Sequence, residues 1–130
     1  MEIYILKVLY FEQTKVSRKL AVPKLALLPK FVEFMAESFD IYKESIEDYF
    51  IGGRDANNKR WKITSQEIMS AVPFKRKDYN LENVINRNPE FITVVNQKTP
   101  YIFNVKFVET QLIEKSMQPA ILEKVGEIEI

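Results

Sequence analysis

The sequence predicts an α+β fold in which an antiparallel sheet packs with one long amphipathic helix. Three observations lead to this class. Segments rich in β-branched and aromatic residues occur near both ends of the chain, one segment in the first half has apolar residues at helical spacing, and turn residues separate the segments. The chain is 46% hydrophobic, so 130 residues can bury a core without disulfides or metal. We expect residues 1–130 to form a single domain.

The first elements are expected to be strands. Residues 2–11 (EIYILKVLYF) carry apolar side chains on both faces, which is typical of a strand that is covered on each side. Residues 14–22 are expected to form a second strand that ends at Pro23.

The strongest helix signal lies in residues 29–50. Pro29 suits the first turn of a helix, and Gly52 follows the segment as a stop signal. A break near Asp40, which would give two shorter helices, is the alternative. The apolar stripe consists of Phe31, Met35, Phe39, Tyr42, Ile46 and Tyr49. Acidic residues follow the same spacing on another side of the helix: Glu33, Glu37, Asp40, Glu44 and Glu47.

The middle of the chain begins with a loop and a short strand. Residues 52–58 (GGRDANN) are dense in turn formers, and residues 59–63 (KRWKI) predict the strand. Alternation along that strand should turn Trp61 inward while Arg60 and Lys62 face water.

Two short helices are expected next. Thr64 and Glu67 form a capping box, which predicts a helix over residues 65–72. A basic connector, residues 74–79 (FKRKDY), leads to the second helix, residues 81–88. Asn80 is placed to cap this second helix, and the Asn-Pro pair at residues 88–89 should end it.

The last part of the chain predicts a hairpin and a final strand. Residues 90–96 and 101–108 flank a four-residue loop, as in a β-hairpin. Residues 110–117 are expected to form one or two helical turns, and residues 125–130 (VGEIEI) a last strand. The exposed strand edges could pair between subunits, so homo-oligomerisation is left open.

The element order over residues 64–108 resembles a winged helix-turn-helix. In that superfamily the second helix of the unit lies in the DNA major groove, and the hairpin is a wing that touches the DNA backbone. The resemblance implies that residues 81–88 read base edges, with base contacts from Asn83 and Asn86. It implies phosphate contacts from Lys75, Arg76, Lys77, Arg87 and Lys98.

Charge is segregated along the chain although the net charge is only +1. Residues 51–87 are mainly basic, whereas residues 31–50 are mainly acidic, which indicates a polarised surface suited to macromolecular partners. The basic part favours a nucleic-acid-associated protein. The alternative is a protein–protein module, such as a viral or mobile-element assembly or inhibitor protein, that binds its partner through Glu33, Glu37, Asp40, Glu44 and Glu47.

The sequence contains no histidine, no cysteine and only three glycines. It therefore offers no imidazole base, no thiolate nucleophile and no soft metal ligand. We expect a binding protein that is not an enzyme and that uses no cofactor or metal. No apolar run reaches the length of a membrane span, and no export signal is recognised, so we expect a cytoplasmic protein without a membrane partner.

Overall fold

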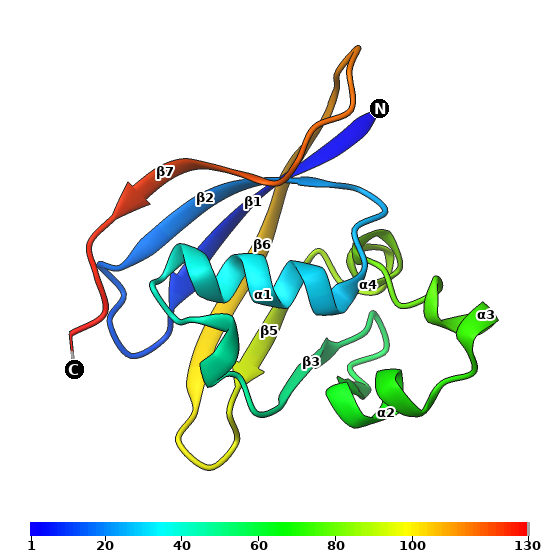
Figure 1. Ribbon diagram of the computed structural model, residues 1–130, viewed down its shortest axis with the longest axis horizontal. Coiled ribbons are helices and arrows are strands. Elements are labelled where there is room, and N and C mark those ends of the chain that lie inside the picture. The colour runs from blue at the N-terminus through cyan, green and yellow to red at the C-terminus, as the bar shows by residue number, and fades with distance from the viewer. Residues whose placement is uncertain (130) are drawn as a thin grey trace.

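Residues 1–129, which the computed structural model describes, form a seven-stranded antiparallel sheet with helices beside it (Figure 1). The strands are β1 (Glu2–Tyr10), β2 (Ser17–Pro23), β3 (Tyr49–Arg54), β4 (Arg60–Thr64), β5 (Glu90–Val95), β6 (Tyr101–Leu112) and β7 (Ala120–Val125). Their order in the sheet is β4-β3-β5-β6-β1-β2-β7, and every neighbouring pair is antiparallel. The predicted α+β class with an antiparallel sheet is therefore confirmed.

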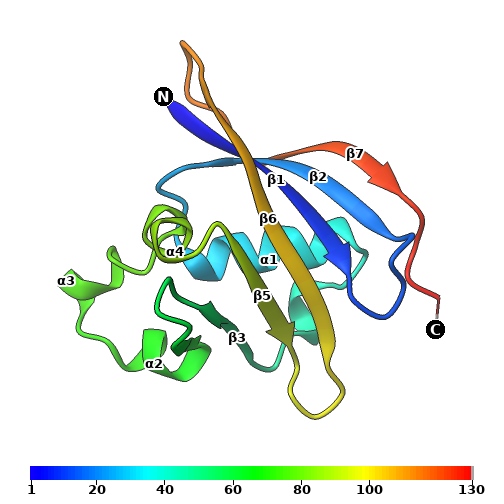
Figure 2. The same cartoon turned by 180° about the vertical axis from the view of Figure 1, so that it is seen from behind.

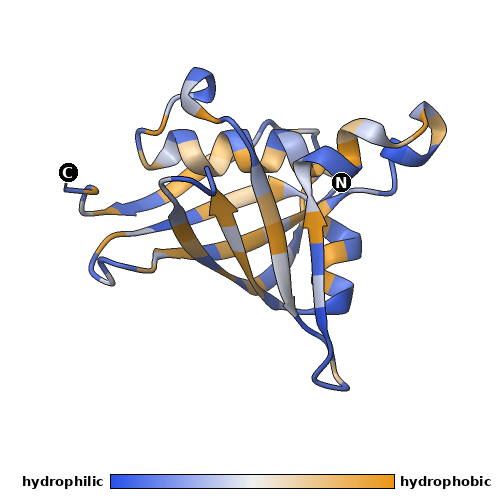
Figure 3. Ribbon diagram, turned by 90° about the horizontal axis from the view of Figure 1, so that it is seen from below, coloured by the Kyte–Doolittle hydropathy of each residue, from blue (hydrophilic) through white to orange (hydrophobic). Residues whose placement is uncertain are grey.

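One helix covers one face of the sheet. The helices are α1 (Leu28–Ser38), the 3₁₀ turn η1 (Lys43–Ser45), α2 (Ser65–Ser70), α3 (Pro73–Arg76) and α4 (Leu81–Arg87). In Figure 1, α1 lies in front of the central strands, and in the opposite view these strands lie in front of α1 (Figure 2). Figure 3, which views the molecule from below, shows α1 on one side of the strands. The sheet therefore has a covered face and a face without α1.

The main core lies between α1 and the covered face, and it also contains Leu81 and Val84 of α4. Leu6 and Val8 of β1 point toward α1 and are fully buried, and they belong to the same apolar cluster as Phe31 and Met35 of α1. Burial of each such side chain stabilises the fold by about 1.5–3 kcal/mol. Side chains alternate along β1, so its even-numbered apolar residues point to one face and its odd-numbered residues to the other. Packing against the even-numbered residues holds α1 on their side of the sheet.

The predicted helix over residues 29–50 is wrong beyond Ser38. Asp40 adopts a left-handed backbone conformation (φ 63°), which aspartate tolerates better than most residues. The N–H of Ile41 then donates to the carbonyl of Ala36 at 3.0 Å, which closes a Schellman motif at the end of α1. The chain therefore leaves the helix at Asp40.

The predicted break near Asp40 occurs, but residues 41–50 do not form the second α-helix of that alternative. A single 3₁₀ turn comes next, and residues 49–54 are strand β3. Tyr49, Phe50 and Ile51 pair with Val95, Val94 and Thr93 of β5, respectively. Aromatic and β-branched side chains suit a strand as well as a helix, and the pairing with β5 decides between them.

Two further predictions at the C-terminal end are wrong. Residues 110–117 do not form helical turns, because β6 continues through Leu112, which pairs with Glu2 of β1. The last strand is not residues 125–130 but β7, which ends before Gly126 (φ 72°). Residue 130 of that prediction lies outside the described residues.

Both predicted helix caps are confirmed. The hydroxyl of Thr64 accepts a hydrogen bond from the backbone N–H of Glu67 at 3.0 Å. The side-chain oxygen of Asn80 accepts one from the backbone N–H of Asn83 at 2.9 Å. An additional helical turn, α3, forms in the basic connector, where Pro73 occupies the first turn.

A buried arginine links α1 to the edge of the sheet. Arg18 of β2 is 1% exposed, and its guanidinium lies 4.5 Å from the centre of the Phe39 ring. Its Nε donates to the carbonyl of Ser38 at 2.5 Å, and one Nη donates to the carbonyls of Val125 and Gly126 at 3.2 and 2.9 Å. Desolvation lowers the pKa of Arg18 from its ordinary value. One side chain thus ties the end of α1 to the end of β7.

Replacing Arg18 by methionine is expected to lower the free energy of unfolding by at least about 3 kcal/mol, because buried carbonyls lose their donor. Urea denaturation monitored by the fluorescence of Trp61 measures this loss. Arg18→Lys is the matched variant, and it should recover less than half, because one ammonium group cannot serve α1 and β7 together. A loss below about 1 kcal/mol for Arg18→Met would contradict the linking role.

The burial of Tyr49 should make the free energy of unfolding fall at alkaline pH. Burial, assisted by the charge of Glu33, raises the pKa of Tyr49 to about 12. The unfolded chain ionises its tyrosines near pH 10, so the stabilisation from Tyr49 is complete below about pH 10 and is lost as the pH rises through 12. We expect Tyr49→Phe to reduce the fall in unfolding free energy between about pH 9 and pH 12 by about 2–3 kcal/mol. Urea titrations at each pH, with exposed Tyr42→Phe as control, test this. An equal fall in both variants would contradict it.

Candidate functional site

The predicted basic run lies on the outer part of the helical region. Lys75, Arg76 and Lys77 are exposed on α3 and directly after it. Arg76 is already bound, since Nε donates to the carbonyl of Ala71 at 3.0 Å and Nη2 to that of Met69 at 3.1 Å. These bonds hold the turn between α2 and α3. Within residues 1–129, Lys75 and Lys77 form no ion pair.

In the predicted reading helix, α4, two of the polar side chains already contact other parts of the protein. The side-chain amide of Asn83 donates to the carbonyl of Asp78 at 2.7 Å. The guanidinium of Arg87 lies 5.4 Å from the centre of the Trp61 ring. Of the three predicted polar residues on this helix, Asn86 is exposed and without such a contact in the described part of the chain.

A cavity of about 460 Å³ lies beside α4. Asn83 and Arg87 line it together with Glu67 and Tyr79. The hydroxyl of Tyr79 donates to the carboxylate of Glu67 at 3.2 Å. Positive, negative and neutral polar groups therefore share this cavity, and it does not favour a polyanion.

The predicted hairpin is confirmed as β5 and β6, but the interpretation of it as a wing is wrong. β5 pairs with β3 on its other side, and β6 pairs with β1, so both strands are internal to the sheet. Lys98 lies in the turn after β5, whereas α4 precedes β5. The six residues of β5 separate the two by about 20 Å. Lys98 and α4 therefore do not form one contact surface.

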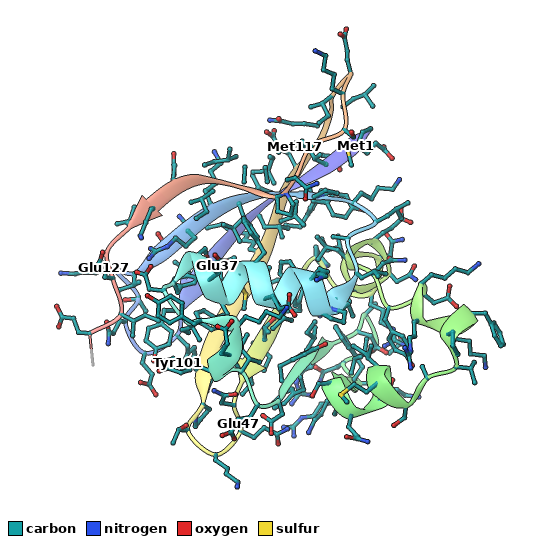
Figure 4. The ribbon with its side chains drawn as sticks, viewed as in Figure 1. Met1, Glu37, Glu47, Tyr101, Met117 and Glu127 are labelled. Atoms are coloured by element: carbon teal, nitrogen blue, oxygen red, sulfur yellow. The ribbon has the colours of Figure 1, made fainter. Side chains whose placement is uncertain are left out.

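The acidic residues of the alternative interpretation do not form one helical stripe. Glu33 on α1 lies 3.7 Å from Lys30 and 4.0 Å from Lys43, while Asp40 sits in the Schellman turn, 3.7 Å from Lys124. Glu44 belongs to η1. Figure 4 shows Glu37 on α1 and Glu47 well below it, near the start of β3.

The face of the sheet opposite α1 contains cations that the sequence analysis missed. We call it the open face. It is covered locally near Ile3, Ile5 and Ala21, where Ile113 and Met117 of the β6–β7 connection pack on it. Figure 4 shows Met117 beside Met1 at this end. Elsewhere the open face carries both polar and apolar side chains.

Three lysines lie directly opposite one another on the open face. Lys7 of β1 pairs in register with Lys106 of β6 on one side and with Lys19 of β2 on the other. We call these three residues the lysine row. Lys7 and Lys106 are exposed and Lys19 is half-buried, and within residues 1–129 none of them forms an ion pair. Like charges directly opposite in a sheet are destabilising. Departures from such local rules concentrate at functional sites.

Glutamates mark both ends of the lysine row. Glu90 of β5 is in register with Lys106, and Glu123 of β7 is in register with Lys19. The carboxylate of Glu90 accepts a hydrogen bond from the side chain of Asn104 at 2.8 Å instead of pairing with a lysine. The open face thus carries three neighbouring lysines with a glutamate on each side.

A groove of about 450 Å³ continues the open face over β3 and β4. We call it the Gly52 groove, because Gly52 pairs with Lys62 on one side and Ile92 on the other and leaves a gap between them. A Cβ atom on Gly52 would lie 3.0 Å from the carbonyl oxygen of Trp61, so a larger residue would be crowded. The groove is lined by Phe50, Gly52, Ile92 and the cations Arg54, Arg60 and Lys62.

Two negative findings apply to residues 1–129. No group of three acidic side chains in this range is arranged to hold a metal ion. None of the helices in this range has both the length and the apolar character that a membrane span requires.

Relief of repulsion in the lysine row should stabilise the fold. Lys7→Gln is expected to raise the free energy of unfolding by about 0.2–1 kcal/mol at low salt. The gain should disappear at about 1 M NaCl, where the Debye length is roughly 3 Å and the repulsion among the lysines is screened. Urea denaturation at both salt concentrations measures it, with Lys98→Gln in the β5–β6 turn as control. A gain that is the same at both salts would show that repulsion is not its source.

The fold is similar to the crystal structure of a protein of unknown function from Methanosarcina mazei Go1. The two share a TM-score of 0.73 and 14% sequence identity over 95% of this chain and 68% of the other. No protein-family model matches the sequence, and no curated protein matches it. At this identity, the likeness to the archaeal protein shows the fold alone.

Proposed function

We propose that this protein is a non-enzymatic nucleic-acid-binding module whose open face receives the phosphate backbone. The observation that carries the proposal is the lysine row. Lys7, Lys19 and Lys106 stand in register on three adjacent strands and form no ion pair within residues 1–129.

The physical basis is neutralisation of these charges by phosphate. Each lysine that contacts a phosphate releases counterions from the nucleic acid, which favours binding most strongly at low salt. The same contact removes the repulsion among the three ammonium groups. Because the net charge of the chain is only +1, the attraction would come from this local cluster rather than from overall charge.

The residues predicted from the sequence define a second candidate region. Lys75, Arg76, Lys77, Asn83, Asn86 and Arg87 lie on or next to α3 and α4, and Lys98 lies apart from them. Their role in phosphate or base contact stays a prediction. It is separable from the role of the lysine row by mutation, because the two regions share no residue.

The test is fluorescence anisotropy with labelled single-stranded and duplex DNA over about 50–200 mM NaCl. The triple variant Lys7→Gln/Lys19→Gln/Lys106→Gln should bind at least tenfold more weakly at low salt. The slope of log K against log salt should fall by about 2–3, which corresponds to the loss of about three phosphate contacts. Urea denaturation confirms that the variant is folded.

The matched control is Lys75→Gln/Lys77→Gln/Lys98→Gln, which removes the same charge elsewhere. A larger loss in this control than in the lysine-row variant would assign binding to the helical region and contradict the proposal. Absence of DNA binding by the unmodified protein at low salt would contradict the proposal and favour the protein-partner alternative.

A further inference from the structure

The open face has an apolar strip next to the lysine row. One step along the strands from the row, Ile92 of β5 is in register with Asn104 of β6, which pairs with Leu9 of β1. One step further, Phe50, Val94 and Ile102 are in register on β3, β5 and β6. Ile92 is 38% exposed, Leu9, Phe50 and Ile102 are half-buried, and Val94 is buried. We call these five apolar residues, Leu9, Phe50, Ile92, Val94 and Ile102, the apolar strip.

The two features lie beside each other on β6 and β1; the apolar strip continues over β5 and β3, and the lysine row continues to β2. Residues two apart on one strand are separated by about 7 Å, so the apolar strip begins about 7 Å from the lysine row. Neighbouring strands are about 4.8 Å apart, so each line extends in the direction that crosses the sheet. On β6 and β1 the open face thus presents a cationic line with an apolar line beside it.

We propose that the nucleic acid bound by this face is single-stranded, with phosphates on the lysine row and bases on the apolar strip. This inference rests on the proposed function. An unpaired strand has charged phosphates along one side and exposed bases along the other, which matches the two lines. In a duplex the bases are stacked inside, so the open face would meet phosphates and sugars, and the apolar strip would make no contact with bases.

The Gly52 groove is the place for one base. Its volume of about 450 Å³ is sufficient for a small flat group. Phe50 and Ile92 supply its apolar lining, and the ammonium group of Lys62 lies 4.4 Å from the centre of the Phe50 ring. The guanidinium groups of Arg54 and Arg60 form no ion pair within residues 1–129, and Arg54 donates to the carbonyl of Asn58 at 3.3 Å. A nucleotide in the groove would therefore place its base on apolar carbon and its phosphate near two arginines. Such contacts tolerate any base, so sequence preference should be weak.

The sharpest test compares probes that differ only in their bases. Labelled oligothymidylate of about 15 nucleotides, an abasic oligonucleotide of the same length and charge, and a duplex of that length are titrated by anisotropy. The unmodified protein should bind oligothymidylate at least tenfold more tightly than the abasic strand, because base contacts add about 1–3 kcal/mol each. It should also prefer oligothymidylate to the duplex.

A point variant locates the bases. Ile92→Ser should weaken binding of oligothymidylate at least about fivefold and leave the abasic strand unaffected. The matched control is Ile121→Ser, which removes a similarly exposed isoleucine (44%) that lies opposite Leu20 and outside the open face. This control should bind all probes as the unmodified protein does.

The two proposals fail in different ways. Equal affinity for oligothymidylate and the abasic strand, with loss of both in the lysine-row variant, would overturn the single-strand inference and support phosphate binding alone. Unchanged binding in the lysine-row variant would overturn the proposed function itself. Displacement of oligothymidylate by polyglutamate at equal charge would identify a site for any polyanion and overturn the inference.

Discussion

The arrangement of this protein depends on one constraint: a seven-stranded sheet has two faces, and α1 covers only one of them. The other face must tolerate water wherever nothing packs on it. The residues of β1 follow this division, since Ile5 is buried under the β6–β7 connection and Lys7, two residues further, is exposed. Solvation explains why charged or polar residues such as Lys7 occupy uncovered positions. It does not explain why three such positions in register are all lysine, because alternating signs would satisfy water equally well and stabilise the sheet.

Arg18 shows the opposite use of positive charge. It lies on the covered face, where desolvation acts on its charge, and carbonyl oxygens rather than carboxylates accept its hydrogen bonds. Since the guanidinium serves α1, β2 and the end of β7 together, it fixes the edge strand against the helix layer. The charge of Arg18 is thus used for structure. The ammonium groups of Lys7 and Lys106 have no equivalent acceptors within residues 1–129 and remain available for an external anion.

Local signals allowed much of the secondary structure to be predicted, whereas features that depend on strand order could not be. The caps at Thr64 and Asn80 are short-range hydrogen bonds, and the inward position of Trp61 follows from alternation along one strand. The helix that was extended past Asp40 shows the limit, because apolar residues at helical spacing continued into a segment that pairs as β3. The lysine row is visible only after β6, β1 and β2 are placed side by side, since its members are far apart in sequence. The wing was mispredicted for the same reason. A free hairpin and a hairpin inside a sheet have the same local sequence pattern, and only the pairing of β5 with β3 and of β6 with β1 distinguishes them.

The fold alone leaves the function open, because similar sheets at 14% identity can carry different surfaces. This surface is distinguished by the glutamates that lie on both sides of the lysine row. Glu90 and Glu123 limit the lysine row to three strands, a width of about 10 Å, and cations resume at Arg54 beyond Glu90. A rigid polyanion that crosses the whole sheet must pass the carboxylate of Glu90. A flexible strand can instead direct a base toward Ile92 at that point and return its phosphates to Arg54. The carboxylate of Glu90 therefore favours a flexible single strand, which can bend around it, rather than a stiff duplex.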